Sequence, residues 1–160
     1  MSDEPVVRWA EPSDVSELIR LIGEFAGFER FEHLNGLDKE SLDRALFSNL
    51  DFCKCFVVES SGKLIGYSIF YPIFRTFSGA LALHLEDLYI IPEHRGHGLG
   101  RSLLKSISKY ALENKFERID FQVLDWNADA IKFYEKLGAS QVGGNLDFTF
   151  PENTLRALAK

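Results

Sequence analysis

The feature that most constrains the fold is a run of alternating glycines: Gly96, Gly98 and Gly100. Before it, residues 81–91 predict the longest strand of the chain, ended by Pro92, and after it residues from about 99 to 114 predict a helix. Alternating glycines let backbone N–H groups converge on one point, and the helix start adds free N–H groups and a positive dipole end. This arrangement is typical of a pyrophosphate cradle, with Arg95 as a fixed charge beside it. The alternative is a flexible loop that binds nothing.

Two other phosphate-binding motifs do not match this turn. The P-loop needs four residues between its glycines and then Gly-Lys-Ser/Thr, and the sequence contains no such string. The dinucleotide fingerprint is G-x-G-x-x-G directly after a strand, whereas here the spacing is G-x-G-x-G after an intervening Pro92-Glu93-His94-Arg95. The turn also lies late in the chain, without repeated βαβ units. The sequence therefore disfavours both nucleotide-binding classes.

The other segments predict an α/β fold. Strand patterns lie at residues 6–9, 53–59, 64–71 (ended by Pro72), 119–124 and, after a Gly143-Gly144 turn, 146–150. A hairpin turn is expected at residues 60–63. Helices are expected after Asp14 (with Glu17, a capping-box-like start), after Asp38 and Asn127, and from Glu152. This order predicts a mixed, mostly antiparallel sheet with one parallel strand pair, flanked by helices.

Composition narrows the class of protein. The chain has 160 residues, 46% apolar and 26% charged, which fits one soluble globular domain over residues 1–160. The net charge of −6 disfavours nucleic-acid binding and suits a cationic small substrate. No apolar run approaches the ~18 residues of a membrane helix, and the acidic start is unlike a secretory signal. Cys53 and Cys55 are expected to be reduced core thiols, so we expect a cytoplasmic protein.

The turn Arg95-Gly96-His97-Gly98-Leu99-Gly100 resembles the acyl-CoA motif Arg/Gln-x-x-Gly-x-Gly/Ala of the GCN5-related N-acetyltransferase (GNAT) superfamily. Further stretches resemble its diamine acetyltransferase branch, the spermidine/spermine and thialysine N-acetyltransferases: Leu18–Glu29, Leu85–Pro92, Asp125–Asn127, Phe133-Tyr134 and Leu137–Ala139. The resemblance implies a GNAT fold in which the parallel strand pair splays at a bulge. It also implies acetyl-CoA as co-substrate, no metal, and a homodimer.

The same resemblance implies which residues hold acetyl-CoA. The pantetheine arm would pair with the backbone around Leu88, Tyr89 and Ile90, as an extended ligand does with an exposed strand edge. Asn127 would both cap its helix and contact the coenzyme. The full expected set is Leu88, Tyr89, Ile90, Arg95, Gly96, His97, Gly98, Leu99, Gly100, Arg101, Asn127, Ala128, Asp129 and Ala130.

Two residues are candidates for proton transfer. An alkylamine, with a pKa of about 10.4, is mostly protonated at pH 7, so the site needs a proton acceptor. Glu86 is the candidate general base, and the alternative is that it only contacts the substrate cation. The resemblance places the general acid for the leaving thiolate at Tyr134, and the alternative there is a core aromatic residue. Within this strand we expect two sets of side chains on opposite faces: His84, Glu86 and Leu88 on one, and Leu85, Asp87 and Tyr89 on the other.

The substrate-binding residues implied are Phe28, Glu29, Glu86, Asp87, Asp120, Phe121 and Gln122. The carboxylates of Glu29, Glu86 and Asp87 would favour a cation, so we expect a small-molecule amine as the substrate. Arg75 departs from the polyamine enzymes, because it would repel the second charge of a polyamine and could instead pair with a carboxylate. The stretch 124–127 also resembles the thialysine enzymes, so we expect an acceptor like thialysine, lysine or ornithine. The alternatives are a polyamine N-acetyltransferase, a protein or peptide N-acetyltransferase, and a non-catalytic acyl-CoA-binding module.

Overall fold

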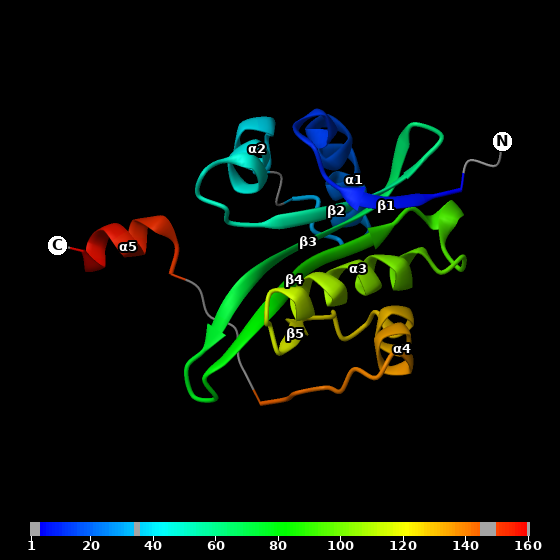
Figure 1. The fold of residues 1–160 in the computed structure, drawn as a ribbon. Helices are drawn as coiled ribbons and strands as arrows, with labels where there is room; N and C mark the ends of the chain where they lie inside the picture. The colour runs from blue at the N-terminus through cyan, green and yellow to red at the C-terminus, as the bar shows by residue number, and fades with distance from the viewer. Residues whose placement is uncertain (1–3, 34–35, 145–149, 160) are drawn as a thin grey trace. The chain divides into compact units, whose positions relative to one another are not determined.

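The computed structural model describes residues 4–33, 36–144 and 150–159 (Figure 1). Residues 1–122 form one compact unit and residues 123–160 another. The strands of the first unit are β1 (Val6–Trp9), β2 (Lys54–Ser60), β3 (Lys63–Arg75), β4 (Ala80–Ile90) and β5 (Arg118–Phe121). Its helices are α1 (Val15–Phe28), α2 (Lys39–Phe47) and α3 (Leu99–Glu113), with 3-10 turns η1 (Pro12–Asp14) and η2 (Pro92–His94).

The described strands form one mixed sheet in the order β1-β2-β3-β4-β5. Neighbours pair antiparallel from β1 to β4, and β4 pairs parallel with β5. A parallel partner needs a crossover connection, and α3 supplies it. The predicted fold class, a mostly antiparallel mixed sheet with a parallel pair, is confirmed.

Helices cover both faces of this sheet (Figure 1). On one face, Leu18 and Leu21 of α1 pack with Tyr67 of β3 in a first core cluster. On the other face, Leu103 and Ile107 of α3 pack in a second cluster against β2, β3 and β4. All five side chains are fully buried, and each such burial contributes about 1.5–3 kcal/mol to folding. Both faces of the central strands are therefore apolar over most of their length.

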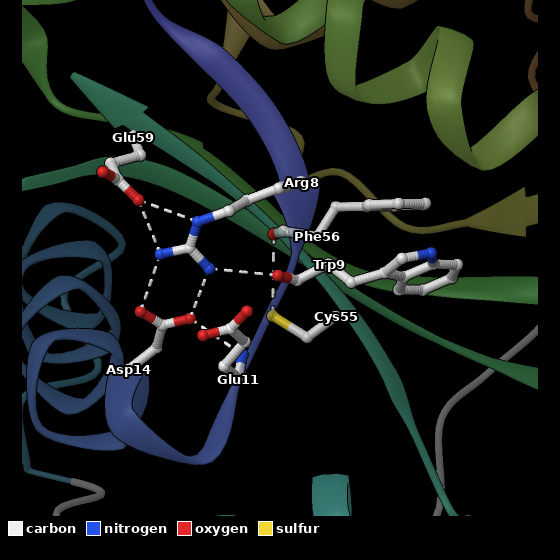
Figure 2. A network of polar contacts seen from close by, with 7 residues as sticks. All are labelled: Arg8, Trp9, Glu11, Asp14, Cys55, Phe56 and Glu59. Atoms are coloured by element: carbon white, nitrogen blue, oxygen red, sulfur yellow. Dashed lines mark hydrogen bonds and ion pairs between the residues drawn. The ribbon is translucent and has the colours of Figure 1, made fainter. Parts of the chain in front are cut away.

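The start of α1 differs from its expected capping box. The carboxylate of Asp14 accepts two hydrogen bonds from the Arg8 guanidinium, at 2.7 and 3.0 Å, and one from the Glu11 backbone N–H at 2.8 Å (Figure 2). Nε of Arg8 also donates to Glu59 of β2 at 2.8 Å. The Arg8 hydrogen bonds hold the pKa of Asp14 below its ordinary value. Asp14 thus connects η1 to β1, Arg8 connects both to β2, and the Asp14 side chain does not cap α1.

Strand β3 also corrects the expectation that Pro72 ends it, because it continues to Arg75. The pairing of β2 with β3 stops at Phe70, so beyond that point β3 has β4 as its partner on one side. Such a strand edge tolerates a proline, because the N–H group that proline lacks would face the side without a partner strand. The hairpin turn between β2 and β3 is confirmed: Ser61 and Gly62 both have positive φ, as a type I′ turn requires.

The second unit contains α4 (Ala128–Lys136) and α5 (Glu152–Leu158). Oδ1 of Asn127 accepts a hydrogen bond from the Ala130 N–H at 3.2 Å, which confirms the predicted cap of α4. Gly138 follows the helix with φ 98°, the left-handed conformation that favours glycine. The last predicted strand, 146–150, lies almost wholly outside the described residues. Among the helices that the structure describes, none is long and apolar enough to cross a membrane.

Candidate active site

A β-bulge in β4 decides where its carboxylates point. Ile69 of β3 lies opposite Asp87, but the next residue, Phe70, lies opposite Leu85, so Glu86 is the extra residue. A bulge interrupts the alternation of a strand. Leu85 therefore packs in the α3-side cluster, whereas Asp87 reaches Tyr67 of the α1-side cluster. For this reason two expectations are wrong: Leu85 does not share a face with Asp87, and Leu88, which packs against the α3-side cluster, does not share one with Glu86.

Asp87 is partly buried and hydrogen-bonded. Its Oδ2 accepts from the Tyr67 hydroxyl at 3.0 Å. Burial is the main cause that raises the pKa of Asp87 to about 6; the Tyr67 hydrogen bond opposes this, and the negative charges of Glu86 and Glu29 add to it. Burial also raises the pKa of Glu29. The structure thus brings together three of the predicted substrate-contacting carboxylates, Glu29, Glu86 and Asp87.

Glu86 lies beside two ring side chains on this same face of the sheet. Its Oε2 accepts a hydrogen bond from the Tyr71 hydroxyl at 3.1 Å and lies 3.5 Å from Nε2 of His84. The Tyr71 and His84 rings are 5.0 Å apart. Burial, and then the charge of Glu86, raises the pKa of Tyr71 to about 12. With 54% of its side chain exposed, Glu86 is the more accessible of the two adjacent carboxylates.

The glycine turn has the geometry of an anion cradle. Gly96 and Gly98 take φ of 79° and 80°, conformations that side-chain-bearing residues rarely adopt. Gly98 is the N-cap residue of α3, so the first N–H groups of that helix point out of the turn. A Cβ built at either glycine would meet nothing within 4 Å, so the positive φ, and not a lack of space, is what favours glycine here. His97, inside the turn, is exposed as a variable motif residue would be. The residues present fit a diphosphate.

Arg95 is turned toward the end of β4. Its Nε donates to the carbonyl oxygen of Ile90 at 2.8 Å. Its guanidinium lies over the rings of Phe28 and Tyr89, with centroids at 5.0 and 5.4 Å. Such cation–π contacts contribute about 0.5–1 kcal/mol each at exposed sites. Arg95 therefore connects the glycine turn to the end of α1, where Phe28 and Glu29 lie.

The edge of β4 beyond the bulge is open on the β5 side. Among the described residues, β5 pairs with Ala82–Leu85 and no further. Leu88, Tyr89 and Ile90 follow on the open edge and lead directly toward the glycine turn. The parallel pair therefore ends before these residues, and a strand edge without a strand partner can bind an extended ligand.

The predicted residues of β5 divide between two faces of the sheet. Asp120 lies opposite His84 and forms ion pairs with Arg75 and Arg118. Phe121 packs against the α3-side core cluster, away from the carboxylates of β4. Gln122, just past the strand, is exposed. The structure thus does not bring Phe121 together with Glu86 and Asp87.

The remaining predicted residues belong to the second unit. Tyr134 is half-buried in α4, with its ring 5.0 Å from that of Phe133 in an edge-on contact. Ala128, Asp129 and Ala130 form the first turn of α4 behind the Asn127 cap. The first turn of a helix carries N–H groups and a positive dipole end, which suit an anionic ligand.

Three contributors were not predicted from the sequence: Tyr67, Tyr71 and Arg118. The signal for the tyrosines was their spacing on one strand, which places both side chains on the face that carries Glu86. Arg118 had no local signal, because its role depends on the pairing of β5 with β4. Among the described residues, no group of three or more histidine, cysteine and acidic side chains is placed to hold a metal ion.

The comparisons agree with this architecture. The model of the Acetyltransferase (GNAT) family matches residues 19–139. Over 164 residues the chain is 34% identical to the thialysine N-epsilon-acetyltransferase of Mus musculus, and the alignment covers 96% of each chain. It is 25% identical over 178 residues to an L-ornithine N5-acetyltransferase of Arabidopsis thaliana, covering 83% of this chain and 78% of that one.

A solved structure shows the same fold. The integron cassette protein from the mobile metagenome of V. cholerae superposes with a TM-score of 0.78 at 22% identity, over 100% of this chain and 99% of that one. A strand edge that opens beside a backbone anion cradle is the arrangement of an acyltransferase of the GNAT fold. The chain belongs to the GNAT acetyltransferase family. Within that family it is an N-acetyltransferase.

Proposed function

We propose that this protein transfers the acetyl group of acetyl-CoA to the primary amine of a small, amino-acid-like acceptor such as thialysine, lysine or ornithine. The observation that carries the proposal is the course of β4. This strand bears Glu86 and Asp87 at its bulge, then an open edge, and ends at the glycine turn. One strand therefore offers a cation site and a coenzyme site in sequence.

The coenzyme is expected to bind along this path. Its pyrophosphate would accept hydrogen bonds from the N–H groups of the glycine turn and the first turn of α3. Its pantetheine arm would pair with the backbone at Leu88–Ile90, which brings the thioester toward the bulge. This placement is supported by the positive φ of Gly96 and Gly98 and by the open edge of β4.

The transfer itself is a direct attack. Glu86, directly or through water, accepts a proton from the substrate ammonium, while Asp87 and Glu29 stabilise the cation as it binds. The neutral nitrogen then attacks the thioester carbonyl carbon, so a C–N bond forms and the C–S bond breaks. Tyr134 donates its phenolic proton to the leaving thiolate and regains a proton from solvent. A homodimer and a cytoplasmic location remain expectations from the resemblance and the composition.

A thiol-release assay with acetyl-CoA tests this proposal. The acceptors are thialysine, lysine, ornithine, spermidine, putrescine and a short peptide. We expect the highest kcat/KM with one of the three amino acids. We expect Tyr134→Phe to lower kcat by about 10²–10⁴-fold, the usual contribution of a general acid.

The matched control is Tyr110→Phe, which removes the same hydroxyl from a tyrosine that packs against Phe70 and Trp9. Its kcat should stay near that of the wild type. A higher kcat/KM for spermidine than for every amino acid would contradict the acceptor class. Full kcat in Tyr134→Phe would remove that residue from the mechanism.

A further inference from the structure

A second charged cluster lies on the face of the sheet that carries Glu86. It consists of Arg75 at the end of β3 with Arg118 and Asp120 of β5, and we call it the arginine clamp. Nε and Nη2 of Arg75 lie 3.0 and 2.9 Å from Oδ2 of Asp120. Nε of Arg118 lies 3.1 Å from Oδ1 of the same carboxylate. Asp120 therefore holds two guanidinium groups that come from different strands.

The clamp retains a net positive charge. It contains two guanidinium groups and one carboxylate, so one positive charge is uncompensated within it. Each guanidinium has five N–H donors, and Asp120 engages only one or two of them on either arginine. Both arginine side chains are 48% exposed, whereas Asp120 is 26% exposed. The acid is thus covered by its partners, and the arginines face the solvent.

The position of the clamp follows from strand register. Asp120 lies opposite His84 in the parallel pair, and His84 lies 3.5 Å from Glu86. On β3, Tyr71 contacts Glu86, and Arg75 comes four residues later on the same face. Because a strand rises about 3.3 Å per residue and the bulge takes up one residue, Glu86 and Asp87 lie about 3–7 Å along β4 from the level of Asp120. Negative and positive groups thus follow one another on a single face.

We propose that the arginine clamp binds a carboxylate of the acceptor substrate, with Arg75 and Arg118 as its donors and Asp120 as the residue that orients them. This inference rests on the proposed function, because it assigns the other end of the molecule whose amine meets Glu86. It also gives Asp120 a more specific role than the substrate contact expected from the resemblance. A guanidinium fork matches the geometry of a carboxylate and selects it over a second ammonium group.

The dimensions fit an amino acid that carries a terminal amine. With bonds of about 1.5 Å, an extended lysine separates its side-chain nitrogen from its carboxyl carbon by about 7 Å. This length is comparable to the separation between the carboxylates at the bulge and the level of Asp120. A polyamine of similar length would instead bring a second positive charge to the clamp, where like charges repel.

Three acceptors that differ at one group test the clamp: lysine, lysinamide and cadaverine. Lysinamide replaces the carboxylate by a neutral amide, and cadaverine lacks it. We expect wild-type kcat/KM to be about tenfold higher for lysine than for lysinamide, the worth of one charge-assisted hydrogen-bonded pair. Arg75→Gln and Arg118→Gln should each reduce this ratio, mainly through KM, and leave kcat/KM for lysinamide and cadaverine within about twofold. The control is Lys109→Gln, which removes one positive charge from α3 on the opposite face of the sheet.

Asp120→Asn separates the two roles of that residue. If Asp120 orients the arginines, this variant should lower the ratio of kcat/KM for lysine to that for lysinamide, with kcat/KM for lysinamide and cadaverine within about twofold of the wild type. If Asp120 contacts the substrate cation, kcat/KM should fall for lysine, lysinamide and cadaverine alike, and the clamp would be refuted. Thermal unfolding by circular dichroism checks that each variant is folded.

The outcomes also distinguish the clamp from the proposed function. Turnover of all three acceptors at equal kcat/KM, unchanged in the arginine variants, would overturn the clamp and leave small-amine acetylation standing. Turnover of none of them, or of a peptide alone, would overturn both. Selective loss of lysine turnover in Arg75→Gln and Arg118→Gln, with cadaverine unaffected, is the result that supports the clamp.

Discussion

At the scale of single residues, two adjacent carboxylates of one strand have different environments. Glu86 is exposed and meets the Tyr71 hydroxyl, whereas Asp87 is partly buried against Tyr67. Burial favours the neutral form of an acid, and a hydrogen bond from a phenol favours the charged form. In Asp87 burial prevails, so the native protein holds a proton there more tightly than the unfolded chain does.

This difference predicts how stability depends on pH. The pKa of Asp87 rises from 3.8 to about 6 on folding. The favourable contribution of Asp87 to the free energy of unfolding is therefore complete below about pH 4 and is lost as the pH rises through about 6. Asp87→Asn does not titrate, so its stability relative to the wild type should increase between pH 4 and 7 by roughly 2–3 kcal/mol, measured by urea unfolding.

A second variant checks the cause of that dependence. The Tyr67 hydrogen bond lowers the pKa of Asp87, so Tyr67→Phe should move the loss of stability to higher pH. A stability difference between Asp87→Asn and the wild type that is constant from pH 4 to 7 would show that Asp87 is not responsible.

At the scale of elements, the contact between β3 and β4 depends on a close approach at Gly66. A Cβ at this position would lie 2.8 Å from the backbone oxygen of Tyr89 and 2.3 Å from Cδ1 of Ile90. The Ile90 side chain can move, but a shift of the backbone of a central strand would reduce the stability of the fold. The strand that carries Leu88–Ile90, the expected pantetheine edge, thus depends on a glycine of its neighbour.

Two glycine substitutions should have opposite effects. Gly66→Ala should destabilise the fold by about 1–3 kcal/mol, because the strands must separate to admit the methyl group. Gly23→Ala should stabilise it by about 0.5–1 kcal/mol, since Gly23 lies within α1 and a Cβ there meets nothing within 4 Å. Urea unfolding of both variants measures these two changes in the free energy of unfolding. A neutral Gly66→Ala would mean that the sheet adjusts at no cost.

At the scale of the whole molecule, the family match runs from residue 19 to 139 and so includes residues of both compact units. A ligand that binds only the native state stabilises it by mass action. Acetyl-CoA is therefore expected to stabilise the native protein.

The melting temperature should rise with acetyl-CoA concentration. At a hundredfold excess over Kd, the expected stabilisation is about 2.7 kcal/mol. Gly98→Ala should abolish most of this shift, because a side chain strains a residue with φ of 80° and relief of that strain would displace the converging N–H groups. Differential scanning fluorimetry with and without acetyl-CoA measures both proteins. An equal shift in Gly98→Ala would contradict the cradle.

The sequence by itself determined most of the helices and strands and the glycine turn. Periodicity, caps and turn residues predicted α3, the Asn127 cap and the hairpin at Ser61-Gly62, because these depend on local backbone preferences. The family resemblance also followed from local motifs, and the family match confirms it. Local preference failed at Pro72, which a strand edge tolerates, and at Asp14, whose carboxylate binds Arg8 of β1.

Only the tertiary structure decided how the charged groups meet. The bulge at Glu86 arises from the pairing of β3 with β4, and it turns Asp87 and Leu85 to opposite faces against the simple alternation. The arginine clamp needs β3 and β5 to place Arg75 and Asp120 side by side, although they are far apart in the sequence. Strand register is a non-local property, set by how whole faces pack, so a local pattern cannot specify it.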